Sequence, residues 1–148
     1  METTSDNTLS IEGFEEKFQS RFANVYANDA SGIVVCVLQG DYVPIEFFKE
    51  TFKQISEVIA GGGYHKFIFD KRSLRTFHQP SMEWYFIHWK KDMLAHGVKE
   101  HRKILPEIEW FKKAVMIAKD QLMEQYPSNI IEQLNIKYCD SIEEAIAS

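Results

Sequence analysis

The sequence predicts an α/β fold in which helices pack on a mixed sheet of four to five strands. Within residues 21–41, two runs of strand-forming residues flank "NDASG", whose Asn, Asp and Gly favour a tight turn, so we expect an N-terminal β-hairpin. An amphipathic helix, a glycine stop and a second apolar run follow, which is the order of a parallel βαβ unit. Two further helix–strand pairs repeat this order, and 148 residues suffice for one domain with a sizeable core.

The region before the hairpin carries few structural signals. We expect residues 1–8 to be disordered and residues 9–148 to form the single domain. Ile11, Phe14 and Phe18 are spaced as on one side of a helix, which favours a short amphipathic helix here. "METTSDNTLS" has neither the basic nor the apolar segment of a signal peptide, and no apolar run approaches the roughly 18 residues of a membrane span. We therefore expect a cytoplasmic protein.

The run "IVVCVL" at 33–38 does not alternate polar and apolar residues, which is typical of a strand covered on both faces near the centre of a sheet. Cys36 lies inside this run, where it is expected to behave as a small buried hydrophobic residue. With Cys139 as the only other cysteine, we expect no disulfide and a reducing compartment.

Three helices and their following strands complete the predicted domain. The apolar residues of the helix at 43–60 form one stripe, and "GGG" at 61–63 supplies a C-cap before the buried strand "YHKFIFD". Asp140 is the expected N-cap of the last helix, and Glu143 would complete a capping box. The remaining elements are a helix at 80–96, the strand "HRKIL", a helix at 107–125, the strand "NIKYC" and the terminal helix "DSIEEAIA".

The helix that follows Pro80 is apolar on more than one side. On a wheel of about 100° per residue, Trp84 lies nearly opposite the core side, with His88 and Lys91 near it. Trp110 likewise flanks the core stripe of the helix at 107–125. A helix with a second apolar side needs another cover, which can be a neighbouring helix, a partner subunit or a membrane. These four residues are therefore candidate binding residues. The core side itself is formed by Met82, Tyr85, Phe86, Trp89 and Met93.

Charge and motif content argue against several function classes. A net charge of −5 argues against a nucleic-acid partner. The basic segment at 86–103 is interpreted as a solvated helix end, with a functional anion site as the alternative. The chain contains no phosphate-loop spacing, no HExxH among its five histidines and no G-x-S-x-G elbow. We therefore expect no enzymatic activity, no metal ion and no cofactor.

Two polar residues near the end of "YHKFIFD" are further binding candidates. Asp70 lies at the carboxyl end of a predicted parallel strand, where open α/β sheets bind their ligands, and Arg75 lies in the basic loop that follows. The alternative for Asp70 is a structural role as a loop or cap residue.

The order of elements, together with "IFDKRSLRTF", "EWYFIHWKKDM", "HRKILPEIEWF" and "YCDSIEEAIA", resembles the STAS domain of SpoIIAA-type anti-sigma factor antagonists over residues 20–148. More closely, it resembles the SpoIIAA-like (STAS/CRAL-TRIO-like) family of small bacterial proteins. In phosphorylatable STAS antagonists, a serine in an Asp-Ser-Ser-Gly stretch begins the helix after the strand equivalent to "KFIFD". That motif is absent here, and the resemblance leaves Ser81 as the candidate phosphoacceptor, with plain helix initiation as the alternative.

The function expected from this resemblance is that of a non-enzymatic regulatory or signalling module that docks onto a protein partner or a second copy of itself. CRAL-TRIO relatives imply an alternative, in which the protein carries or senses a small apolar ligand or lipid and contacts membrane surfaces. A docking face would leave Trp84 exposed, whereas a carrier would need an apolar cavity of roughly some hundreds of Å³ under a mobile helix.

Overall fold

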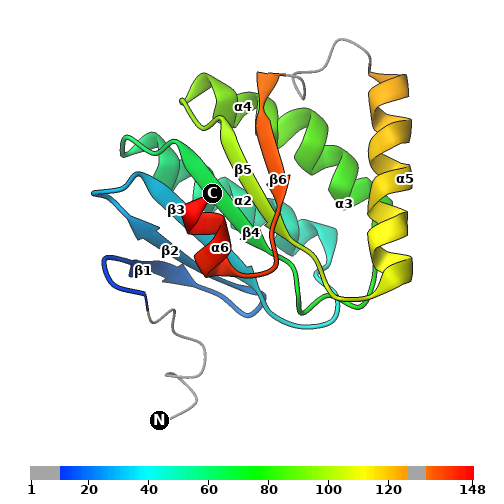
Figure 1. Cartoon of the computed structure of the whole chain (residues 1–148), viewed down its shortest axis with the longest axis horizontal. Coiled ribbons are helices and arrows are strands. Elements are labelled where there is room, and N and C mark those ends of the chain that lie inside the picture. The colour runs from blue at the N-terminus through cyan, green and yellow to red at the C-terminus, as the bar shows by residue number, and fades with distance from the viewer. Residues whose placement is uncertain (1–10, 127–132) are drawn as a thin grey trace.

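A computed structural model describes residues 11–126 and 133–148 and shows one sheet whose six strands lie side by side in chain order (Figure 1). The first three strands pair antiparallel, and the last four, from β3 onward, pair parallel. The mixed α/β sheet with an N-terminal hairpin is thus confirmed, with one strand more than expected. The strands are β1 (Glu15–Gln19), β2 (Ala23–Asn28), β3 (Ile33–Leu38), β4 (Lys66–Asp70), β5 (Glu100–Ile104) and β6 (Asn135–Tyr138).

The additional strand is β1, and it replaces the helix predicted from the spacing of three apolar residues. Ile11 and Phe14 pack against one face of the sheet, whereas Phe18 packs against the other, so the three side chains do not share a helical side. Pairing with β1 also satisfies the backbone groups that the outer edge of β2 would otherwise leave open. The disorder predicted for residues 1–8 concerns residues that lie outside the described part of the chain.

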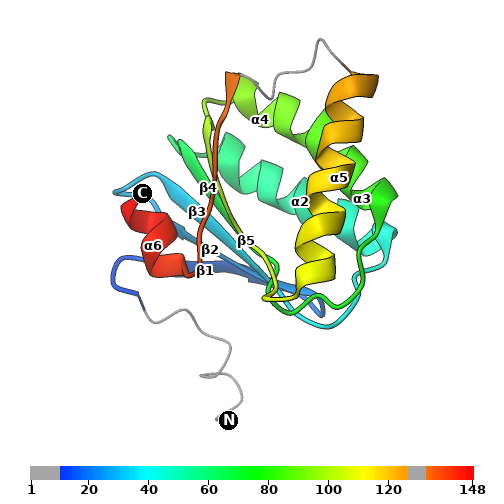
Figure 2. The ribbon, with the colours of Figure 1, turned by 45° about the vertical axis from the view of Figure 1, so that its right-hand side comes forward.

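Two layers of helices enclose the sheet. On one face lie α2 (Ile45–Ala60), a long irregular helix and α5 (Glu109–Gln125), and on the other face lies α6 (Ile142–Ala147) alone (Figure 2). Strand β3 is covered on both faces, as "IVVCVL" predicted, because Cys36 packs on the first face and Val35 on the second. Among the described residues, no helix is both long and apolar enough to cross a membrane.

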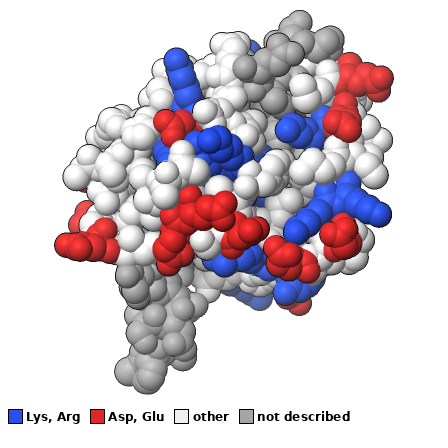
Figure 3. Space-filling view, in the orientation of Figure 1, with Lys and Arg blue, Asp and Glu red and all other residues white. Residues whose placement is uncertain are grey.

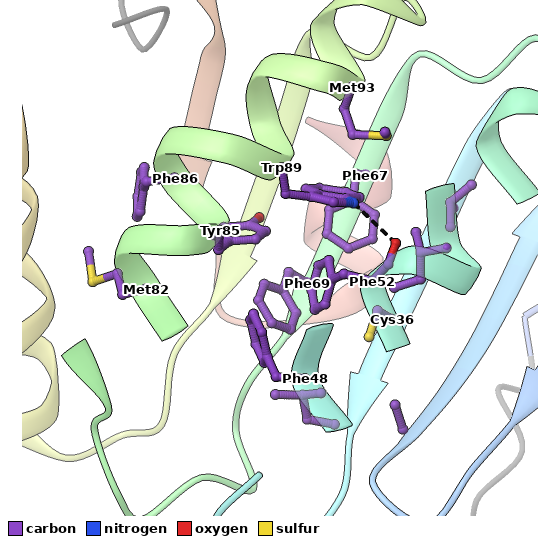
Figure 4. Close-up of a cluster of buried hydrophobic side chains, with 14 of the residues drawn as sticks. Cys36, Phe48, Phe52, Phe67, Phe69, Met82, Tyr85, Phe86, Trp89 and Met93 are labelled. Carbon is purple, nitrogen blue, oxygen red and sulfur yellow. Dashed lines mark hydrogen bonds between the residues drawn. The ribbon is translucent and has the colours of Figure 1, made fainter. Parts of the chain in front are cut away.

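An aromatic core joins α2, the irregular helix and β4 (Figure 4). Phe52 of α2 is fully buried, and its ring lies 5.1 Å from Phe69 and 4.9 Å from Trp89, measured between centroids. The indole nitrogen of Trp89 donates hydrogen bonds to the Phe52 carbonyl at 3.2 Å and to Ser56 Oγ at 2.8 Å. Trp89 is therefore a core residue, as predicted.

The irregular helix has a π-helical centre that the sequence did not reveal. It consists of α3 (Gln79–Trp84), the π-helix η1 (Tyr85–Trp89) and α4 (Lys90–Ala95). The Lys90 N–H bonds to the Tyr85 carbonyl, five residues back, so each turn here holds about one residue more than an α-turn. A helical wheel of about 100° per residue therefore gives the wrong side-chain directions across this segment.

Trp84 lies where this wider turn puts it, and the prediction that it faces away from Trp89 is wrong. Its half-buried ring packs against α2, with centroids 6.1 Å from Phe48 and 6.3 Å from Phe52. The Lys49 amine covers the ring at 5.9 Å. Of the three covers considered for Trp84, the structure therefore shows a neighbouring helix of the same chain.

The N-cap of α6 is Ser141 rather than Asp140. The Ser141 hydroxyl accepts from the Glu144 N–H, and Glu144 Oε1 accepts from the Asp140 N–H at 3.1 Å. The cap falls one residue late because the Cys139 N–H still bonds to the Lys103 carbonyl of β5. The predicted capping box is therefore displaced by one position.

Candidate functional site

A pocket opens where β3 and β4 end and α2 and α3 begin, which is the edge at which open α/β sheets bind ligands. We call it the carboxyl-edge pocket. Its volume is about 60 Å³. It is lined by Leu38, Tyr42, Val43, Phe48, Phe69, Lys71, Leu74, Thr76, Phe77, His78, Ser81, Met82, Tyr85 and Phe111.

The pocket wall is mainly apolar and contains no carboxylate. Its polar groups are a lysine amine, a histidine ring and a few hydroxyls. A wall with this composition favours a ligand that is largely apolar and offers hydrogen-bond acceptors or negative charge to the lysine.

Lys71 is the charged residue of this wall. Its N–H donates to the Ile104 carbonyl at 2.9 Å, which continues the β4–β5 pairing by one residue. Strand alternation then places its side chain on the same face as Phe69, whose ring centroid lies 5.2 Å from Nζ. Lys71 is only 8% exposed, and none of the described residues forms an ion pair or hydrogen bond with its amine. Burial lowers the pKa of this amine to about 8.

His78 and Ser81 form the polar corner of the pocket. His78 is the N-cap of α3, because its Nδ1 accepts from the Ser81 N–H at 3.3 Å, and Ser81 Oγ lies 2.8 Å from the same nitrogen. Ser81 is buried, with 7% of its surface exposed. Since the cap already uses Nδ1 and none of the described carboxylates bonds to the ring, the pair has the geometry of a helix cap rather than of a catalytic dyad.

Asp70 and Arg75 lie outside the pocket. Asp70 is buried on the opposite face, where its carboxylate accepts from the Arg72 backbone N–H and from the Arg72 guanidinium at 2.7–3.0 Å. The exposed Arg75 donates to the carbonyls of Arg72 and Leu74. Both residues hold the shape of the loop after β4, which corresponds to the structural alternative considered for Asp70.

The other predicted binding residues do not line the pocket either. His88 and Lys91 are exposed on the outer side of the irregular helix, and Trp110 is 52% exposed on α5. The structure therefore brings Ser81, but none of the other predicted site residues, into the carboxyl-edge pocket. Sequence reasoning missed Lys71, although its position two residues after Phe69 predicts that it points to the same face.

The two cysteines and the histidines offer no alternative site. Cys36 is fully buried, and burial, followed by the nearby Asp70 carboxylate, raises the pKa of its thiol far above the ordinary value. Cys139 is also a free, buried thiol. Within residues 11–126 and 133–148, no group of three or more His, Cys, Asp or Glu side chains could hold a metal ion.

Comparisons of the chain with models of protein families, with curated proteins and with solved structures give no significant match. The resemblance to SpoIIAA-like proteins thus remains a prediction. The fold class and the geometry of the carboxyl-edge pocket are the findings from which a function must be inferred.

Proposed function

We propose that this protein is a non-enzymatic regulatory module that senses a small, largely apolar molecule with an acidic group, bound in the carboxyl-edge pocket. The observation that carries the proposal is the buried Lys71 amine, which faces an apolar wall free of carboxylates. The acid group of the ligand would pair with this amine, and its apolar part would lie against Leu38, Val43 and Phe77.

The energetics favour an acid over a neutral ligand. An ammonium group without a counter-charge is costly to bury, and a bound carboxylate offsets that cost at Lys71, which is largely shielded from water. A charge-assisted hydrogen bond contributes about 1.5–3 kcal/mol, which corresponds to about ten- to a hundredfold in affinity. The volume of about 60 Å³ suits a short or single-ring acid better than a lipid chain.

The order of the elements supports a module of the STAS type. An N-terminal hairpin followed by parallel helix–strand units is the order on which the resemblance to SpoIIAA-like proteins rests. The helix-cap geometry of His78 and Ser81 supports a role in binding rather than in catalysis.

A second candidate function is docking of a protein partner or a second copy of the chain through α5. Trp110 and Ile117 are 52% and 57% exposed, and they are seven residues apart, which puts them on one side of the helix. Trp110→Ser should then lower the sedimentation coefficient of any complex, while a matched change at exposed Phe47 should not. An unchanged coefficient would remove this candidate.

The ligand proposal is tested with benzoate and its neutral analogue benzamide, titrated into isotope-labelled protein at pH 7 and followed by NMR. The wild type should bind benzoate at least tenfold more tightly than benzamide, with shifts centred on the pocket. Lys71→Met should lose that preference, whereas Lys53→Met, which removes an exposed lysine of α2, should keep it. The same affinity for benzoate in wild type and Lys71→Met, or no binding of either compound, would refute the proposal.

A further inference from the structure

Six side-chain nitrogen and oxygen atoms with essentially no exposed surface lack a geometric hydrogen-bond partner among the described residues, and all six belong to one cluster. They are the Lys90 and Lys103 amines, the Tyr85 and Tyr138 hydroxyls and both ring nitrogens of His101. We call these five residues the lysine cluster. Buried polar groups are nearly always satisfied, so a cluster of unsatisfied ones needs a physical explanation.

The cluster lies between η1 and strands β5 and β6. Lys103 Nζ is 3.6 Å from the centroid of the Phe86 ring, 5.2 Å from that of Tyr85 and 5.9 Å from that of Tyr138. Lys90 Nζ is 4.3 Å from the Phe86 centroid and 5.1 Å from that of Tyr85. Both amines thus lie around the same aromatic rings in the interior.

The π-helix is what turns Lys90 inward. Tyr85 and Lys90 are linked by the hydrogen bond over five residues, which brings their side chains to the same side of the helix. His101 and Lys103 lie on one face of β5, with the buried Arg102 between them on the other face, and so face the same region. The prediction of a solvated helix end at 86–103 is therefore wrong for Lys90 and Lys103, which have no exposed surface.

Buried cations on the opposite face of the sheet have oxygen acceptors for their hydrogen bonds. Lys66 Nζ donates to the Ala145 and Ile146 carbonyls at the end of α6. Arg102 donates to the Ser148 carbonyl at 3.0 Å and has Glu100 at 3.6 Å. The fold therefore supplies oxygen acceptors for buried cations on that face. The Lys90 and Lys103 amines interact with each other, but none of the described oxygen atoms accepts a hydrogen bond from either.

The electrostatic environment of the cluster is positive. Burial lowers the pKa of Lys103, and the neighbouring Lys90, followed by Lys71, lowers it further. Burial also lowers the pKa of Lys90, and the interaction with Lys103 offsets only part of that effect. Burial, followed by the charges of the two cluster lysines, likewise lowers the pKa of His101. No aspartate or glutamate forms an ion pair with Lys90 or Lys103 in the described part of the chain.

We infer that the lysine cluster is an internal binding site for a compact anion, a phosphate or carboxylate group, held by the Lys90 and Lys103 amines and the Tyr85 and Tyr138 hydroxyls. These groups are hydrogen-bond donors from the irregular helix, β5 and β6, and what they lack is an acceptor with negative charge. An anion would accept these hydrogen bonds and favour the protonated form of both amines, which take up their protons from water as it binds.

A second pocket shares Tyr138 with the lysine cluster. It has a volume of about 200 Å³, lies between α5 and the ends of β5 and β6, and has Tyr138 in its wall. Tyr138 is half-buried, and the amines of Lys103 and Lys119 lie 5.9 and 6.0 Å from the centroid of its ring. Lys112 and the acids Glu107 and Asp140 also line the pocket, and Lys112 pairs with Glu107 at 3.1 Å.

Figure 3 shows basic side chains on the surface between β6 and α5, with a band of acidic side chains across the lower part of the same face. An anion would reach the lysines past Tyr138, along the basic part of this surface. The carboxyl-edge pocket shares Tyr85 with the cluster but contains neither Lys90 nor Lys103, so this inference does not depend on the proposed ligand of that pocket.

The test uses inorganic phosphate and phenyl phosphate. Both carry a phosphate group, and only phenyl phosphate also carries an apolar ring. Urea unfolding of the wild type at pH 7 is followed at rising concentrations of each, with sodium chloride at equal ionic strength as the reference. Ligands that bind only the folded state raise the unfolding midpoint in a saturating way. Equal responses to both compounds would indicate a free ion, and a response to phenyl phosphate alone would indicate the head group of a larger ligand.

Lys90→Met and Lys103→Met should each weaken the saturating response at least tenfold in anion concentration. Both variants should fold, because methionine fills a similar volume without a buried charge. Lys99→Met removes an exposed lysine beside β5 and should respond as the wild type does, which also corrects for the general stabilisation of proteins by phosphate. As a second readout, the phosphorus NMR line of either compound should broaden with wild type only. The same midpoint response in all four proteins, or no saturating response at all, would overturn the inference.

Discussion

Replacement of Lys71 by methionine should stabilise the protein, although Lys71 is buried and lines the candidate ligand pocket. Burial lowers the pKa of Lys71 from 10.5 to about 8. At about 1.4 kcal/mol per pH unit, the protonated amine therefore costs the fold about 3 kcal/mol. Methionine has a similar length, carries no charge and can pack against Phe69, so the variant avoids that cost.

The pH dependence gives this prediction a defined sign. Between about pH 8 and pH 10.5, the unfolded wild type holds the Lys71 proton and the folded wild type does not. The free energy of unfolding of the wild type therefore rises with pH between about pH 8 and pH 10.5. Above about pH 10.5, Lys71 is neutral in both states and its burial no longer lowers stability. Lys71→Met lacks this titration, so its advantage over the wild type should be largest at pH 7 and shrink by about 3 kcal/mol by pH 10.5.

Urea melts of both proteins at half-unit intervals from pH 7 to pH 10.5 measure this difference directly. Groups that titrate identically in both proteins contribute nothing to the difference in unfolding free energy. Lys53→Met serves as the control, because Lys53 is exposed and its removal should shift the curve little. Parallel curves for wild type and Lys71→Met, or a variant less stable than the wild type at pH 7, would show that the Lys71 amine is not buried without a counter-charge.

Three further outcomes follow from the same structure. The affinity of wild type for benzoate should fall about tenfold per pH unit above pH 8, because the Lys71 amine deprotonates; a flat profile in the NMR titration would contradict the ion pair. Trp89→Ala should lower the free energy of unfolding by about 3–5 kcal/mol. Trp84→Ala should also destabilise, by less because its ring is half-buried under α2, and urea melts that leave Trp84→Ala unchanged would contradict this packing. Cys36 should react with a thiol reagent only after unfolding, and rapid labelling of the native protein would show that β3 is not covered on both faces.

The parts of the fold set by local patterns could be predicted from the sequence. The turn at 28–32 and the apolar run after it place the hairpin and β3, and the single stripe of α2 followed by three glycines places the first parallel crossover. β1 was not predictable in this way, because it forms by pairing with the open edge of β2, a contact that local apolar spacing does not encode.

The candidate site was harder to predict, for two physical reasons. The π-helix has no signal in the spacing of apolar residues, and its wider turn accompanies the packing of Trp84 on α2 and the burial of Lys90. The burial of a lysine is also unexpected from sequence, because lysines are almost never fully buried without a partner. Alternation along β4 could have placed Lys71 beside Phe69. The sequence instead favoured Asp70, because it is the polar residue at the end of the strand, but Asp70 lies on the other face.

The ionisation of the Lys71 amine tests the proposed function most directly. In protein labelled with carbon-13 at the lysine side chains, the Cε resonance of Lys71, assigned by comparison with Lys71→Met, reports the pKa of its amine with and without saturating benzoate. We predict a pKa of about 8 in the free protein and a clear rise when benzoate is bound, because the carboxylate favours the protonated amine. A pKa near 10.5 in the free protein, or the same pKa with and without benzoate, would contradict a Lys71 amine that is buried without a counter-charge and pairs with an acidic ligand.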